Sequence, residues 1–122
     1  MLIFKDGSRY EGSFQMNEIS GFGIYQWRGG KRYEGDWLNN KMHGKGTLVW
    51  PDGKKYIGEF ILDKREGYGE FVWNNGRAYH GLWRGGKQHG EGTYISQDGR
   101  TKRGLWEYGR RLRWLNSYKE PL

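Results

Sequence analysis

A repeat of 23 residues is the feature that most constrains how this sequence can fold. Tyrosine recurs at that interval, each time two residues before a glycine and four before an aromatic residue, at Tyr10, Tyr33, Tyr56 and Tyr79. A pair of glycines separated by one residue follows in every unit, and a turn glycine ends it. A fixed period of this length indicates equal units that stack on their neighbours.

Within a unit the side chains alternate with a period of two residues, which is typical of β-strands. Tyr33, Gly35 and Trp37 fall on one face, and Glu34 and Asp36 fall on the other. Segments rich in Gly, Asn and Pro separate these runs and are turn sequences. The sequence therefore predicts an all-β fold, an elongated single-layer antiparallel sheet of stacked β-hairpins with about ten strands and a concave aromatic groove.

We expect the chain to divide into a sheet and a C-terminal cap. The sheet covers residues 1–104, with a partial unit at 1–9 and full units at 10–32, 33–55, 56–78 and 79–101. Residues 105–122 are expected to form a partial fifth unit and a basic C-terminal cap.

The composition predicts an unusual core. There are 21 aromatic residues (7 Trp, 9 Tyr and 5 Phe) against 17 Leu, Ile and Val, and 18 of the 22 glycines fall at four positions of the unit. A glycine leaves room for a neighbouring aromatic ring to lie flat across the backbone, which offsets the weakness of glycine in a strand. We expect the rings to form a thin core that a one-layer sheet cannot wholly cover.

Catalytic residues are poorly supplied, so we expect no enzyme activity, cofactor or metal. The chain has no cysteine, and its five serines have no recurring neighbour that would activate them. His43 and His89 lie two repeats apart, or about 19 Å across four strand spacings, which is too wide for one metal ion. We expect each imidazole to fix a hairpin turn through a backbone hydrogen bond.

The motif letters of two units resemble the MORN repeat (membrane occupation and recognition nexus). The unit from Tyr33 has Tyr33-Glu-Gly35-Asp-Trp37, Lys41-Met-His43-Gly44-Lys-Gly46 and Asp52-Gly53, and the unit from Tyr79 has Gly86-Lys87, His89-Gly90, Gly92 and Asp98-Gly99. Departures occur at Glu18, Ser20, Gly29, Asp63, Glu66, Lys102 and Leu112-Arg113. They put a shared chemistry of the loops in doubt, but not the sheet.

The resemblance implies antiparallel hairpins in an open sheet and a scaffold rather than a catalyst. MORN repeats occur in proteins that link membranes, cytoskeleton and cilia, and as accessory regions of lipid kinases and methyltransferases. We therefore expect an intracellular, cytoplasmic protein associated with cytoskeleton or membrane, which binds a protein partner as an adaptor. The alternatives are a module that recruits the protein to a membrane and an accessory domain of a lipid kinase.

The aromatic row is the predicted binding site for a helix or an extended peptide of that partner. The alternative is that the rings form only the core. The predicted groove residues are Tyr10, Phe14, Trp27, Tyr33, Trp37, Trp50, Tyr56, Phe60, Trp73, Tyr79, Trp83 and Trp106.

The charge is concentrated at the C-terminal end, since residues 99–122 carry five of the seven excess positive charges. Basic groups beside interfacial aromatic rings suit anionic phospholipids or phosphoinositides. The alternative is a terminal cap in which Trp114 and Leu115 cover the last hairpin. The predicted lipid-binding residues are Arg100, Lys102, Arg103, Arg110, Arg111 and Arg113.

Two further expectations concern partners. Nucleic acid is not expected to bind, because the aromatic face is not rich in Lys or Arg and no RNA-binding signature is present. The N-terminal residues begin halfway through a hairpin, which predicts one of two arrangements: the chain is part of a longer array, or this sheet edge pairs with a second copy or with a larger assembly.

Overall fold

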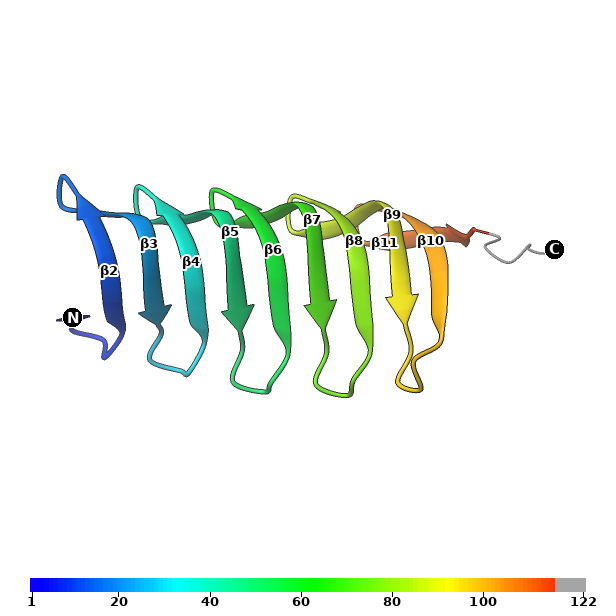
Figure 1. The fold of residues 1–122 in the computed structure, drawn as a ribbon, viewed down its shortest axis with the longest axis horizontal. Helices are drawn as coiled ribbons and strands as arrows, with labels where there is room; N and C mark the ends of the chain where they lie inside the picture. The colour runs from blue at the N-terminus through cyan, green and yellow to red at the C-terminus, as the bar shows by residue number, and fades with distance from the viewer. Residues whose placement is uncertain (116–122) are drawn as a thin grey trace.

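A computed structural model describes residues 1–115 of the chain, in which eleven antiparallel strands form one sheet in chain order (Figure 1). This confirms the predicted all-β fold, with one strand more than the ten expected. The strands are β1 (Leu2–Ile3), β2 (Arg9–Gln15), β3 (Glu18–Gln26), β4 (Arg32–Leu38), β5 (Lys41–Val49), β6 (Lys55–Ile61), β7 (Lys64–Val72), β8 (Ala78–Arg84), β9 (Lys87–Ile95), β10 (Thr101–Glu107) and β11 (Arg110–Trp114).

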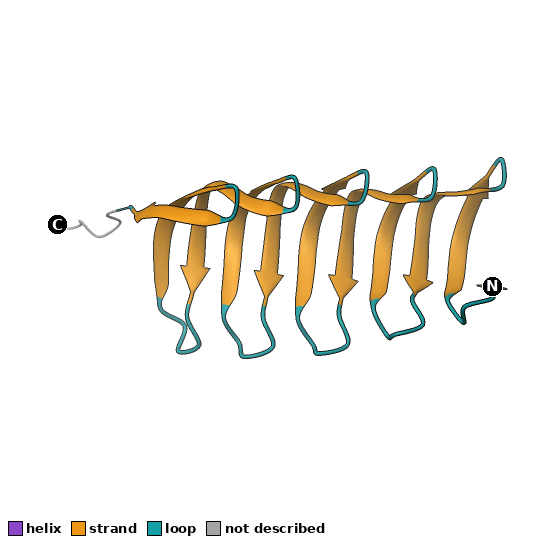
Figure 2. Ribbon diagram, turned by 180° about the vertical axis from the view of Figure 1, so that it is seen from behind, coloured by secondary structure: helices purple, strands orange, loops and turns teal. Residues whose placement is uncertain are grey.

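Two kinds of turn alternate along the sheet: short turns at one end of the strands and longer loops at the other end (Figure 2). The hairpin tips are two-residue turns in which both residues have positive φ, as at Asn39 (47°) and Asn40 (69°). Such turns match the twist of the flanking strands. The longer loops close with one recurring pair of bonds, in which Trp50 N donates to Lys54 O (3.0 Å) and Gly53 N to Trp50 O (3.0 Å).

Each hairpin bends between its long arms and its tip. Gly35 pairs with Gly46 and Trp37 pairs with Met42, so two steps on β4 face four steps on β5. Gly44 lies among the extra residues of β5 and has a φ of 92°, a conformation that favours glycine. The same shift occurs in every hairpin from β2 to β9, and between β10 and β11 one step faces two.

A line of nine glycines in register crosses the long arms from β2 to β10. Its members pair across successive strands, and they are Gly12, Gly23, Gly35, Gly46, Gly58, Gly69, Gly81, Gly92 and Gly104. Tyr33 lies across this line, because a Cβ added at Gly46 would overlap its Oη and Cζ. Its hydroxyl donates to the carbonyl oxygen of Asp36 (2.9 Å). The predicted packing of rings on glycine is confirmed.

The rings of successive repeats form a continuous edge-to-face row on the inner side of the bend. Tyr33, for example, packs against Trp37 of its own repeat (5.0 Å between centroids, 86°) and Phe60 of the next (5.3 Å, 88°). This geometry aligns the ring edges with the neighbouring π faces. The rings near the hairpin tips, such as Trp37 and Phe60, therefore bury the repeated tyrosines, while Phe14, Trp27, Trp50 and Trp73 stay partly exposed, so the row is covered only in part.

The C-terminal hairpin continues the sheet. Strand β10 runs across the predicted boundary at residue 104, so the boundary does not separate two parts. Trp114 packs on Tyr94 (6.2 Å) and Trp106 (6.0 Å), and Leu115 N donates to Arg103 O (2.9 Å), as a cap would require. The rest of the predicted cap, residues 116–122, lies outside the described residues.

Replacing Gly46 by alanine tests the glycine line directly. The new methyl group would overlap Tyr33 and force the ring off the backbone. We expect a loss of about 3 kcal/mol in the free energy of unfolding, measured by urea denaturation. Gly29→Ala is the matched control, because nothing lies within 4 Å of a Cβ at that position. Equal stabilities of the two variants would contradict the packing described.

Candidate functional site

The predicted aromatic groove is mostly core. Eight of its twelve rings are at most 7% exposed, namely Tyr10, Tyr33, Trp37, Tyr56, Phe60, Tyr79, Trp83 and Trp106. Phe14 is 43% exposed, and Trp27, Trp50 and Trp73 are half-buried. The eight buried rings offer almost no surface to a partner in this fold, so their burial does not support a contact along the whole row, which stays a prediction.

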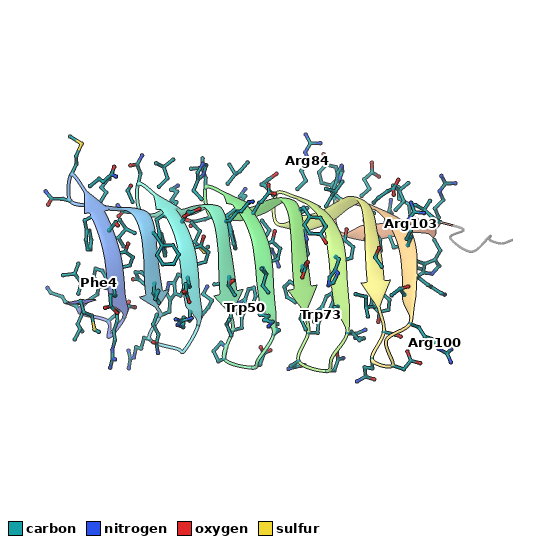
Figure 3. All side chains as sticks on the ribbon, viewed as in Figure 1. Phe4, Trp50, Trp73, Arg84, Arg100 and Arg103 are labelled. Atoms are coloured by element: carbon teal, nitrogen blue, oxygen red, sulfur yellow. The ribbon has the colours of Figure 1, made fainter. Side chains whose placement is uncertain are left out.

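The half-buried tryptophans form a shorter row beside the long loops, where Figure 3 shows Trp50 and Trp73 at matching places in neighbouring repeats. A cation from its own loop lies over each ring. Lys54 Nζ is 5.6 Å from the Trp50 ring centroid, and the Arg77 guanidinium carbon is 5.6 Å from that of Trp73. These cations cover part of each ring and so reduce the apolar surface that the row exposes.

Near the C-terminal end the inner side has two hollows of about 430 and 260 Å³, and Trp73 lines both. Arg65 reaches into the smaller one over the Trp83 ring (4.7 Å) and donates to Gly86 O (2.8 Å). Burial lowers the pKa of this guanidinium. Arg65 thus acts as packing for the rings, with its charge held by a carbonyl oxygen and π faces.

The repeated tyrosines are structural donors. Burial raises the pKa of Tyr33 and Tyr56 well above the ordinary value, and that of Tyr79 to about 12. The Tyr79 hydroxyl donates to Leu82 O (3.1 Å). A neutral, bonded phenol over a peptide plane holds the bend.

The histidines hold neighbouring repeats together, as the prediction of a turn-fixing role requires. His43 Nδ1 accepts from Leu62 N (3.3 Å), and His89 Nδ1 accepts from Tyr108 N (3.1 Å). Each bond reaches the tip turn of the following repeat. In the described residues no group of three or more His, Asp or Glu side chains could hold a metal ion.

The departures from the motif at this position keep the same bond. Ser20 Oγ accepts from Asn39 N (2.9 Å) and Glu66 Oε2 accepts from Gly85 N (2.6 Å). Serine, histidine and glutamate side chains therefore all make this contact. The recurrence of an acceptor every 23 residues is the sequence signal that could have revealed this contact.

A hollow of about 640 Å³, larger than the two on the inner side, lies on the face opposite the aromatic row, which we call the outer face. Its floor is the backbone of Gly35, Gly46 and Gly58. Side chains from five adjacent strands, β3 to β7, form its walls: Phe22, Glu34, Lys45, Thr47, Ile57, Glu59, Tyr68 and Glu70. We call this site the outer hollow.

Three of its walls are exposed apolar side chains: Phe22 is 55%, Ile57 40% and Tyr68 47% exposed. Sequence reasoning missed them, because these positions do not carry the same residue type from repeat to repeat. The residue equivalent to Phe22 is Lys45 in the next unit and Tyr68 in the unit after that. The three lie around one hollow because the register of the folded strands brings them together.

The predicted lipid-binding residues do not form one cluster. Arg100 pairs with Asp98 (3.2 Å) and Arg103 with Glu91 (2.8 Å). Figure 3 shows Arg100 by the long loop and Arg103 farther toward the tip. The remaining four are divided between the inner side, where Lys102 and Arg111 stack on Trp114 (5.0 and 4.4 Å), and the exposed strand positions Arg110 and Arg113.

Comparison with known proteins agrees with the repeat seen in the sheet. The family model described as MORN repeat matches residues 10–32, 33–55, 56–76 and 79–99. A search of curated proteins gave no match. Within residues 1–115 we found no helix with the length and apolarity that a membrane span needs.

The buried phenols predict a loss of stability at alkaline pH. Folding raises the pKa of Tyr79 from 10.0 to about 12. The neutral phenol therefore contributes fully to the free energy of unfolding below pH 10, and this contribution is lost as the pH rises to 12. Tyr79→Phe should cost about 1 kcal/mol at pH 7 through the lost hydrogen bond. Its deficit relative to wild type should shrink between pH 10 and pH 12.

Urea denaturation followed by circular dichroism across this pH range measures both quantities. Tyr108→Phe is the control, because this ring is 58% exposed. A Tyr79→Phe deficit that stays constant from pH 7 to pH 12 would show that the phenol does not couple folding to pH.

Proposed function

The chain belongs to the MORN-repeat family, and we propose that it is a non-enzymatic adaptor that binds a helix or extended peptide of a protein partner in the outer hollow. MORN repeats are protein- and membrane-binding repeat modules. The adaptor role, the identity of the site and the absence of catalysis are the parts we add.

The outer hollow is the observation that carries the proposal. It is larger than either hollow of the inner side and has exposed apolar walls, whereas eight of the twelve rings of the aromatic row are buried. Exposed apolar side chains around a concave site are typical of partner-binding surfaces. The floor is backbone in the middle of a paired sheet, so it needs no rearrangement to receive a partner.

The non-enzymatic part is supported by how the candidate groups are used. The Nδ1 atoms of His43 and His89 accept hydrogen bonds from backbone amides of the next repeat. The buried tyrosine hydroxyls donate to carbonyl oxygens, as Tyr79 does to Leu82 O. An imidazole or phenol fixed in this way serves as a structural contact rather than as a general base.

The cellular setting rests on the family resemblance alone. By that resemblance the adaptor would link cytoskeletal, ciliary or membrane-associated assemblies inside the cell. Pairing of a sheet edge with a second copy stays a prediction.

Removing two apolar walls should abolish partner capture. We expect the double variant Phe22→Ala, Tyr68→Ala to lose the partner in affinity capture from the native cell followed by mass spectrometry. The control Leu38→Ala, Ile61→Ala also removes exposed apolar side chains (40% and 51% exposed), but outside the hollow.

A third variant separates the two faces of the sheet. Trp50→Ala, Trp73→Ala reduces the half-buried row on the inner side and should keep the partner. If this variant loses the partner and the Phe22→Ala, Tyr68→Ala variant keeps it, the binding site lies on the aromatic face instead.

A second candidate function is recruitment to anionic membranes through the C-terminal end. The observation that favours it is that Arg110 and Arg113 are exposed on β11, with no ion pair to an acidic side chain within residues 1–115. Each basic group near an anionic surface contributes roughly 1 kcal/mol.

Charge reversal tests this function separately. With Arg110, Arg111 and Arg113 changed to Glu, co-sedimentation with liposomes that contain phosphatidylserine or a phosphoinositide should fall more than tenfold. Arg9, Arg28 and Arg84 changed to Glu give a control of equal charge at the other end and the edges of the sheet. Unaltered pelleting of the first variant would exclude this route.

A further inference from the structure

We propose that the segment bound in the outer hollow is a basic amphipathic helix of about 14 residues that lies across the strands. This inference rests on the proposed function and adds the chemistry and the shape of the partner. It follows from the charges around the hollow and from the spacing of the strands.

The charge of the outer hollow is opposite to that of the chain. The whole chain has a net charge of +7, but the walls of the hollow carry three carboxylates and one ammonium group. The carboxylates belong to Glu34, Glu59 and Glu70, and the ammonium group to Lys45. A basic segment is therefore favoured locally, although a partner steered by the total charge alone would be acidic.

The register of the strands fixes where the carboxylates lie. Glu34 pairs with Thr47, Thr47 with Ile57, and Ile57 with Glu70, which makes one row across β4 to β7. The two carboxylates of this row are three strand spacings apart, or about 14 Å. Ile57 lies between them and supplies an apolar contact at the same height.

The intramolecular partners of these carboxylates are weak competitors. Arg32 pairs with Glu34 (3.2 Å) and His80 with Glu70 (3.8 Å), and all four side chains are between 36% and 43% exposed. Ion pairs at this exposure contribute little to stability. A Lys or Arg of a partner can replace them, and the apolar walls then exclude water from the new pair.

The shape of the hollow favours a helix over an extended chain. From Phe22 on β3 to Tyr68 on β7 there are four strand spacings, or about 19 Å. A helix turn rises about 5.4 Å, close to one strand spacing, so successive turns can meet successive strands. Same-face side chains of an extended chain are about 6.7 Å apart and fall out of step with the strands.

These dimensions define the partner. Apolar side chains about 13 residues apart on a helix would contact Phe22 and Tyr68, at about 1.5 Å of rise per residue. Lys or Arg side chains nine to ten residues apart would meet Glu34 and Glu70. The expected partner segment is a short helix with an apolar residue near each end. Its basic residues lie beside the apolar face, nine to ten residues apart.

The test selects ligands from a displayed library of random 18-residue peptides with the complete chain. The enriched peptides should be basic and should carry apolar residues with helical spacing. Affinities of the best peptide are then measured by fluorescence anisotropy, and a copy with a central proline should bind at least tenfold more weakly. A neutral or acidic set of enriched peptides, or equal binding of the proline copy, would overturn the inference.

Charge variants give the matched comparison. Glu34→Gln, Glu59→Gln, Glu70→Gln should weaken the best peptide about tenfold at low salt. Glu18→Gln, Asp52→Asn, Glu107→Gln removes the same number of charges outside the hollow and should bind as wild type does. Equal affinities of the two triple variants would overturn the inference.

The Phe22→Ala, Tyr68→Ala variant separates failure of this inference from failure of the proposed function. If enriched peptides lack a basic bias but lose affinity for this variant, the hollow remains the binding site and only the chemistry of the partner is wrong. If the enriched peptides bind this variant as tightly as wild type, the hollow itself is excluded.

Discussion

The contact between a tyrosine ring and a pair of facing glycines is the interaction on which the rest of the structure depends. A ring that lies on the peptide planes of Gly35 and Gly46 replaces the side chains that those positions lack. The hydroxyl of Tyr33 reaches a carbonyl oxygen beyond them and fixes the ring along its strand. Repeated in four units, this contact turns a line of weak β residues into the most buried part of the molecule.

The bend of the hairpins follows from the same contact and decides which face is available. Trp37 donates from Nε1 to Gly23 O (3.2 Å), so the tip ring comes back over the glycine line of the preceding repeat. Rings from the two sides of the bend then alternate along the inner side and bury one another. Side chains on the outer face meet no second layer, and their arrangement is set only by strand register.

The strands, the turns and the ring–glycine contact could be predicted, because both partners of each contact recur every 23 residues. The bend could not, since it depends on a difference in residue count between facing strands and on the φ of Gly44. The burial of eight of the twelve predicted groove rings could not be predicted for the same reason, because it depends on this bend. The contact between repeats through Ser20 and His43 was hidden because different side chains make the same hydrogen bond.

What does not repeat is the part of the sequence that the fold leaves free. The repeated tyrosines and the glycines that they cover are the same in all four units, because the contact between ring and glycine demands them. At the outer position that begins with Phe22 the later units carry Lys45, Tyr68 and Glu91, and no packing rule selects among these residues. A repeat sheet of this kind can therefore hold its core constant while each unit presents a different side chain. Recognition of one partner must then come from the sum of several unlike repeats, which is why an acidic and apolar hollow can form over β3 to β7 in a chain that is basic overall.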